Sequence, residues 1–237
     1  MLIRTVSPAD LQAAYAQGLC PICALNERDE RRYIDTMFYD QVTNVTWRAQ
    51  IRDARGFCAA HTTRILVEGR SALGVALIAD DLLKTVREAL GAAPALRSSA
   101  LSRFRTVVGA GRRRVGAVRS TAACPLCLHL RQQTPVHIRS LLQDLANDGG
   151  RTAYTLSPGL CVAHLVGVLD SSDPPEGIPF LIEHQQRCWQ RLNDELQEFI
   201  RKSDYQFAGE PIGEEGDAWR RAFRLLAGWQ TGQQLRN

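Results

Sequence analysis

Cysteine and histidine residues in this 237-residue chain form a pattern of metal ligands that occurs twice. A C-P-x-C motif is followed after 34 residues by a C-x-x-H motif, and the same two motifs return with 33 residues between them. Six of the seven cysteines lie in these motifs. Three thiolates and one imidazole fill the four positions around a tetrahedral zinc ion, so each copy is predicted to bind one metal ion. The predicted ligands are Cys20, Cys23, Cys58 and His61 in the first copy, and Cys124, Cys127, Cys161 and His164 in the second.

The spacing inside each motif suits the ligation of one ion. In C-P-x-C, proline fixes φ after the first cysteine and can open a helix. In C-x-x-H, the two ligands are three residues apart, which places them on one face of a helix. The long spacer lets a helical hairpin bring the two motifs together, and the positive end of a helix favours thiolates. The sequence therefore predicts that each C-P-x-C shares a site with the C-x-x-H that follows it.

Zinc is the favoured metal, and a [4Fe–4S] cluster is the alternative because it also takes four ligands. The closely spaced cysteines of ferredoxins are missing, which favours zinc. A redox dithiol would need a βαβ setting that the chain does not offer. The amino terminus lacks the apolar run of a signal peptide, so we expect a cytoplasmic protein whose thiols bind metal rather than form disulfides.

The hydrophobic periodicity predicts an all-α protein. Ser7 and Pro8 are expected to begin the first helix, and Gly149 and Gly150 to break the chain. We expect two duplicated helical metal-binding units, packed with pseudo-twofold symmetry, followed by a helical tail. Their predicted ranges are 1–93 for the first unit, 94–116 for a basic linker, 117–203 for the second unit, and 204–237 for an acidic loop and C-terminal helix.

Three histidines and the seventh cysteine lie outside the two predicted ligand sets. His184 and Cys188 are four residues apart, the spacing of a possible extra ligand pair, but no partner pair exists. We interpret them as a core cysteine beside a surface histidine. His137 is expected at the surface. His129, two residues after Cys127, is a candidate neighbour of the second predicted site.

Residues 94–143 carry nine arginines and no acidic residue, whereas residues 144–237 carry 9 basic and 14 acidic groups. A basic amphipathic segment can bind a protein partner, nucleic acid or an anionic surface, and the alternatives are a solvated linker or an internal clasp with the acidic tail. A protein partner or the clasp is favoured because no recognised DNA-binding motif is present. The arginines are Arg97, Arg103, Arg105, Arg112, Arg113, Arg114, Arg119, Arg131 and Arg139, and the first seven are the candidate partner-binding residues.

The tail combines acidic residues with an apolar helical pattern. Asp217 is expected to cap a helix that carries its apolar residues toward a core, namely Trp219, Phe223, Leu226 and Trp229. Glu210, Glu214 and Glu215 are interpreted as acids near a helix start, with a separate acidic site as the alternative.

The paired motifs and the tail G-E-E-G-D-A-W resemble a bacterial family catalogued as a domain of unknown function. The resemblance covers nearly the whole chain and implies a cytoplasmic bacterial protein, but it brings no established activity. Neither a Ser/His/Asp set, a P-loop nor a dinucleotide fingerprint is present, which disfavours an enzyme. The expected function is a zinc-stabilised interaction module, and the alternative is an iron–sulfur protein with a redox or sensing role.

Overall fold

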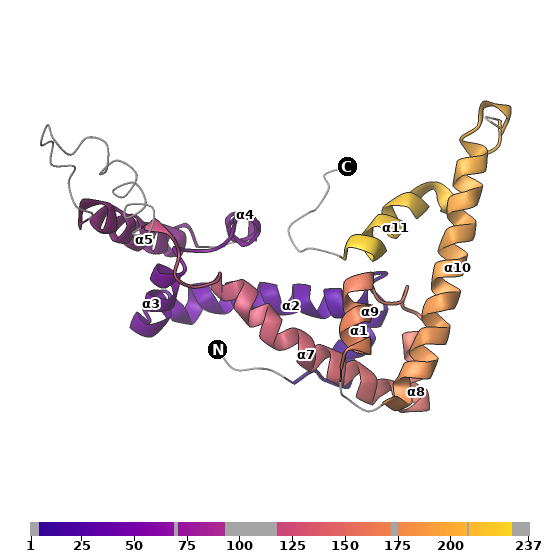
Figure 1. Cartoon of the computed structure of the whole chain (residues 1–237), viewed down its shortest axis with the longest axis horizontal. Helices are drawn as coiled ribbons and strands as arrows, with labels where there is room; N and C mark the ends of the chain where they lie inside the picture. The colour runs from indigo at the N-terminus through magenta and orange to yellow at the C-terminus, as the bar shows by residue number, and fades with distance from the viewer. Residues whose placement is uncertain (1–4, 69–70, 93–117, 172–174, 208, 229–237) are drawn as a thin grey trace, which may run out of the picture. The chain divides into compact units, whose positions relative to one another are not determined.

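The structure is a computed structural model that describes residues 5–68, 71–92, 118–171, 175–207 and 209–228. Over these residues the chain is helical and contains no strand, which confirms the predicted all-α class (Figure 1). No helix in the described part of the chain is both long and apolar enough to span a membrane.

The chain divides into two compact units, and each takes residues from both sequence copies. Unit 1 comprises residues 1–29 and 130–233, and unit 2 contains residues 30–129. The predicted ranges 1–93 and 117–203 therefore do not coincide with the units. The boundary falls inside two helices, α2 (Pro21–Thr36) and α7 (Pro125–Leu145). The pseudo-twofold symmetry stays a prediction, and the linker 94–116 lies outside the described residues.

Unit 1 is built from the beginning of α2, the end of α7 and most of the remaining helices. These are α1 (Pro8–Tyr15), α8 (Asp148–Tyr154), α9 (Val162–Leu169), η2 (Pro175–Gly177), α10 (Ile178–Lys202), η3 (Tyr205–Phe207), η4 (Glu214–Asp217) and α11 (Ala218–Ala227). As predicted, Ser7 caps α1: its hydroxyl accepts from the amide of Asp10, whose carboxylate accepts from the amide of Ser7. α1 packs against α8, and α11 packs against α9 and α10 (Figure 1).

Unit 2 is built from the end of α2, the beginning of α7 and a group of shorter helices. These are the π-helical turn η1 (Met37–Gln41), α3 (Val45–Asp53), α4 (Ala59–Glu68) and α5 (Ala72–Ala92). Asn44 caps α3 by accepting from the amide of Trp47. The indole of Trp47 donates to the hydroxyl of Tyr33 inside a core that also holds Ile34, Met37, Ile51 and Ile65.

The predicted break at Gly149 and Gly150 is wrong, because both residues lie inside α8. A Cβ on Gly150 would stand 2.1 Å from the carbonyl oxygen of Asp144. The glycine therefore allows α8 to begin directly against the end of α7, where a larger residue would collide with the backbone.

Candidate metal sites

The structure forms two groups of four metal ligands, and each group lies within one unit. Site 1, in unit 1, consists of Cys20, Cys23, Cys161 and His164. Site 2, in unit 2, consists of Cys58, His61, Cys124 and Cys127. In each group the four ligand atoms lie within 4.8 Å of one another. All eight predicted residues are therefore brought together in sets that could hold a metal ion.

The predicted pairing of the motifs is wrong. The first C-P-x-C joins the second C-x-x-H in site 1, and the second C-P-x-C joins the first C-x-x-H in site 2. The sites are therefore nested along the chain: site 1 closes a long segment that contains the whole of site 2. Chain order misled the prediction because the two C-x-x-H motifs offer the same ligands at the same spacing.

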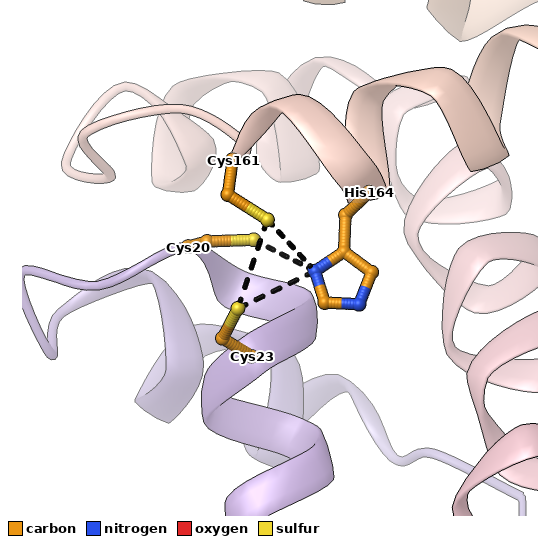
Figure 2. A group of neighbouring side chains, drawn as sticks. All are labelled: Cys20, Cys23, Cys161 and His164. Carbon is orange, nitrogen blue, oxygen red and sulfur yellow. Dashed lines mark hydrogen bonds between the residues drawn. The ribbon is translucent and has the colours of Figure 1, made fainter. Parts of the chain in front are cut away.

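Helix N-termini position all the ligands. In site 1, Cys20 and Cys161 stand directly before α2 and α9, while Cys23 and His164 lie in the first turns (Figure 2). The first helical hydrogen bonds run to the carbonyls of these preceding cysteines, at 3.0 Å for Cys20 and 2.9 Å for Cys161. Site 2 repeats the arrangement with the N-termini of α4 and α7. Amides and partial positive charge at these helix ends stabilise thiolates there.

The geometry of the two sites is nearly the same. In site 1, Nδ1 of His164 lies 3.5 Å from Cys20 Sγ, 3.3 Å from Cys23 Sγ and 3.1 Å from Cys161 Sγ. In site 2, Nδ1 of His61 lies 3.4 Å, 3.3 Å and 3.1 Å from the sulfurs of Cys124, Cys127 and Cys58. One sulfur–sulfur distance in each site is 3.8 Å. Both histidines thus turn Nδ1 inward and Nε2 outward.

A glycine and a glutamine fix the approach to Cys161. Gly159 has a φ of 84°, and a Cβ there would stand 2.7 Å from Oε1 of Gln185. That oxygen accepts from the amide of Leu160 at 2.7 Å, and Nε2 of the same side chain donates to the carbonyl of Leu160 at 3.1 Å. Gln185 on α10 therefore holds the residue that precedes the ligand.

The ligands of site 1 interact strongly in the absence of a cation. Hydrogen bonds from Cys20 and Cys23 lower the pKa of Cys161, whereas hydrogen bonding to its neighbouring cysteines raises the pKa of Cys23. Burial acts to lower the pKa of His164, but its contacts with Cys161 and Cys20 raise it to about 10. One thiolate–imidazolium pair thus forms among crowded thiols. A divalent cation would replace this proton and stabilise all three thiolates together.

At site 2 the same crowding acts on more exposed thiols. Burial, followed by the nearby charges of Cys124 and Cys58, raises the pKa of Cys127 to about 12. Burial and the charge of Arg64 lower the pKa of His61, which keeps its imidazole neutral. A neutral imidazole is the form that binds a metal.

The outward nitrogens of the two histidines meet different neighbours. Nε2 of His61 lies 3.6 Å from a carboxylate oxygen of the buried Glu30. Nε2 of His164 lies 3.4 Å from the side-chain nitrogen of Asn26. A carboxylate or amide behind a ligating histidine fixes the orientation of its ring. The ligand spacing carried no signal for these two residues, although both lie on α2, one and two turns after Cys23.

Asn26 continues into a buried polar network. Its Oδ1 lies 2.9 Å from Nδ1 of His137 and accepts from Thr134, and Nε2 of His137 lies 2.9 Å from Asp29. Burial alone would raise the pKa of Asp29, but the hydrogen bond to His137 and the charge of Arg28 lower it below its usual value. The prediction that His137 lies at the surface is wrong, because this network buries it fully.

The structure also shows the surroundings of the two remaining histidines and of Cys188. His184 is buried rather than exposed, because its Nε2 lies 3.1 Å from the carbonyl of Ser157 and its ring contacts Tyr154. Cys188 is buried as predicted. The ring of His129 lies 5.0 Å from that of Tyr33.

The tail helix differs from its prediction. Asp217 stands at the N-cap of α11, but its carboxylate accepts from Arg221 at 2.6 Å and caps no amide. The apolar residues do not reach a core: Trp219, Phe223 and Leu226 are 43%, 70% and 64% exposed. The helix instead turns Arg221 toward Glu195 on α10, and this ion pair fixes which face is inward. Trp229 lies outside the described residues.

The acids of the tail contact cations of α10. Glu210 pairs with Arg201, and Glu215 lies 2.7 Å from Lys202. Among the predicted partner-binding arginines, Arg119 is exposed in the structure. The remaining six lie outside the described residues: Arg97, Arg103, Arg105, Arg112, Arg113 and Arg114.

Comparison with known proteins adds a family and no activity. No curated protein and no solved structure matches the chain. A family model matches residues 9–233, a range that contains all eight ligands and the helices that position them. The chain therefore belongs to the family of unknown function DUF6062.

Proposed function

We propose that this chain is a structural zinc protein in which site 1 and site 2 each bind one Zn²⁺. Tetrahedral Zn–S bonds of about 2.3 Å place two thiolate sulfurs about 3.8 Å apart. The distances from Cys23 to Cys161 and from Cys58 to Cys127 are both 3.8 Å. This agreement in two separate sites is the observation that carries the proposal.

The alternative is an iron–sulfur protein with a redox or sensing role. In a [4Fe–4S] cluster each thiolate binds a different iron, so the ligands surround several metal atoms instead of one. Ligand atoms that all lie within 4.8 Å of one another support a single ion. Because protein ligands would fill all four positions, a structural role is favoured over a hydrolytic one.

The surroundings of the histidines fit a bound cation. When Nδ1 of His164 binds the metal, its Nε2 carries a proton and needs an acceptor. The Asn26 amide supplies one if it turns its oxygen toward His164 and its nitrogen toward His137. His137 then carries its proton on Nε2 and donates to Asp29, while the hydroxyl of Thr134 donates to the carbonyl of Leu130 and accepts from the amide nitrogen. At site 2, the Glu30 carboxylate lies 3.6 Å from Nε2 of His61, beyond hydrogen-bond distance, and its negative charge favours a proton on that nitrogen.

The role of both ions is to hold a helical interaction module in its folded form. Each ion would link two helix N-termini that are far apart in sequence, so its binding free energy contributes to folding. We place the protein in the cytoplasm, where reduced thiols remain available as ligands. The matching ligand sets support an origin by duplication with pseudo-twofold symmetry. A protein partner is favoured, and nucleic acid bound through the basic segment is the alternative.

Metal analysis of anaerobically purified protein tests the proposal. The expected result is two zinc ions per chain and a colourless protein. Substitution with Co²⁺ should give the intense visible bands of tetrahedral cobalt thiolate. Iron and sulfide in a brown protein that absorbs at about 400 nm would support the cluster instead. One metal ion or fewer per chain in fully reduced protein would contradict two independent sites.

Titration with mixed-sequence DNA and RNA at about 50 and 200 mM salt tests the partner. Weak binding at both salt concentrations is expected for a module that binds protein. Submicromolar binding that falls steeply with salt, and that is lost when Arg112, Arg113 and Arg114 become alanine, would support the nucleic-acid alternative.

A further inference from the structure

A cavity of about 330 Å³ lies in unit 1, beside site 1. Its walls come from α10 and α11 and from the chain segments that precede α2 and α9. Leu192 of α10 and Leu225 of α11 give the cavity an apolar wall. Its volume is at the lower end of the range for small-molecule sites.

The thiol of Cys188 lies in the wall of this cavity. Cys188 is the one cysteine of the seven that belongs to neither metal site. Its sulfur lies 3.2 Å from Nε2 of His184 and accepts from the guanidinium of Arg191 at 3.5 Å. A cysteine beside a histidine and an arginine has the surroundings of a reactive thiol. Since its side chain is only 6% exposed, a small molecule in the cavity can reach the sulfur more readily than a protein can.

Positive charge surrounds the same cavity. Arg191, Arg221 and Arg224 line it, together with a single acidic residue, Glu195. Arg221 pairs with Glu195 and also with Asp217, which does not line the cavity, so three cations and one acid make up the charged lining. The cavity thus combines a sulfur nucleophile with cations that attract carboxylates.

We propose that this cavity is a site of thiol–disulfide exchange, in which Cys188 reacts with small disulfides that carry carboxylates. The Cys188 thiol loses its proton to solvent, and the thiolate attacks one sulfur of the disulfide. A new S–S bond forms as the original one breaks. The departing thiolate takes a proton from solvent, which leaves a mixed disulfide on Cys188 and one free small thiol. The disulfide itself is the oxidant.

The surroundings of Cys188 suit its thiolate form. A carbonyl oxygen only accepts, so Nε2 of His184, 3.1 Å from the carbonyl of Ser157, carries the proton of the neutral imidazole. This N–H also lies 3.2 Å from the sulfur of Cys188, and the guanidinium of Arg191 donates to the same sulfur at 3.5 Å. Both donors therefore stabilise the thiolate that attacks the disulfide.

Two disulfides of similar size and opposite charge test the proposal on the metal-loaded protein. The probes are 3,3′-dithiodipropionate, which is anionic, and cystamine, which is cationic. Mass spectrometry should find one adduct per chain, mapped by peptide digestion to Cys188, with the metal content unchanged. The anionic probe should react about tenfold faster, and added salt should reduce that preference.

Variants separate the chemistry from a general effect on folding. Cys188→Ser should abolish the adduct, and Arg191→Gln should remove most of the preference for the anionic probe. Arg220→Gln is the matched control, because Arg220 stacks on Trp219 and does not line the cavity. If Cys188→Ser folds poorly, peptide mapping of the adduct on the parent protein still identifies the cysteine that reacts. Adducts on the ligand cysteines with release of metal, or equal rates for both probes in the parent protein and in Arg191→Gln, would overturn the proposal.

Discussion

Site 1 and site 2 have the same ligands and nearly the same distances, but they differ in their surroundings. The thiols of site 1 belong to the hydrophobic core of unit 1, where Cys20, Cys23 and Cys161 are at most 4% exposed. The thiols of site 2 are half-buried, and Cys124 packs against the core of unit 2. An amide lies behind the histidine of site 1, and a carboxylate lies behind that of site 2. The ligand set thus defines what can bind, while burial and the histidine partner define how firmly it is held.

Removing one ligand should have the largest effect, and it tests the crossed pairing directly. Cys20→Ser is expected to lose one metal ion and to destabilise unit 1, because structural zinc contributes on the order of 10 kcal/mol to folding. Hydrogen exchange should then rise in α9, whose N-terminus supplies Cys161 and His164 to site 1. Protection in α4 should persist, since its ligands belong to site 2.

Cys127→Ser is the matched variant for site 2 and should show the reverse pattern, with loss of protection in α4 and retention in α9. Cys188→Ser is the control for loss of a cysteine that binds no metal, and it should retain both ions. Loss of protection in α4 in response to Cys20→Ser would contradict the crossed pairing. It would show that each C-P-x-C shares a site with the C-x-x-H that follows it.

Replacing the partner of each histidine should weaken one site alone. Glu30→Gln is expected to lower the metal affinity of site 2, and Asn26→Ala that of site 1, each by about 10- to 100-fold. Competition with a chromogenic chelator measures both affinities in the same protein. Equal weakening of both sites by either variant would show that these residues act on general stability rather than on their own histidine.

Metal release should be faster from site 2, because a chelator and protons reach its half-buried thiols more easily. We expect two kinetic phases that differ by about tenfold or more, each corresponding to one ion per chain. Cys127→Ser should remove the fast phase, and Cys161→Ser the slow one. Release of both ions in a single phase would show that the thiols of the two sites are equally accessible.

The smallest predicted effect concerns Glu215, far from the ligands of both sites along the chain. Hydrogen bonds from the backbone of Gly213 and then from Lys202 lower its pKa to about 2 from an ordinary 4.5. Its stabilising contribution is therefore complete above about pH 4.5 and declines as the pH falls toward about 2. Glu215→Gln should lower the melting temperature by a constant amount between pH 5 and 8, as measured by calorimetry. A decrease in melting temperature that varies between pH 5 and 8 would show that another titratable group causes it.

The sequence was sufficient to predict the helical class and to find all eight ligand residues. Ligand type and spacing are local properties, so each motif could be recognised by itself. The pairing of the motifs could not be predicted, because Cys58 and Cys161 begin chemically equivalent motifs and only the tertiary fold distinguishes them. This is a long-range property, and the spacing of 33 or 34 residues suggested the wrong solution.

The errors on single residues have the same origin. His137 and His184 are buried because groups from other helices or loops, such as Asp29 and Ser157, lie beside them. The amphipathic pattern of α11 was recognised, but it could not indicate that Glu195 would attract the arginine face inward. Local patterns therefore predicted the elements, and the identity of their contacts required the structure.

The nested order of the ligands has a consequence for synthesis on the ribosome. The first C-P-x-C and the first C-x-x-H emerge early, and together they form a complete set of four ligands. The ligands that complete site 1 follow about 100 residues later, a delay of roughly 5–20 s at ordinary elongation rates. A nascent chain exposed to zinc can thus close the pairing that the finished fold rejects. In a nascent chain that binds a metal ion in this way, Cys20 and Cys23 must exchange Cys58 and His61 for Cys161 and His164, so we expect metal supply during translation to change the yield of correctly folded protein.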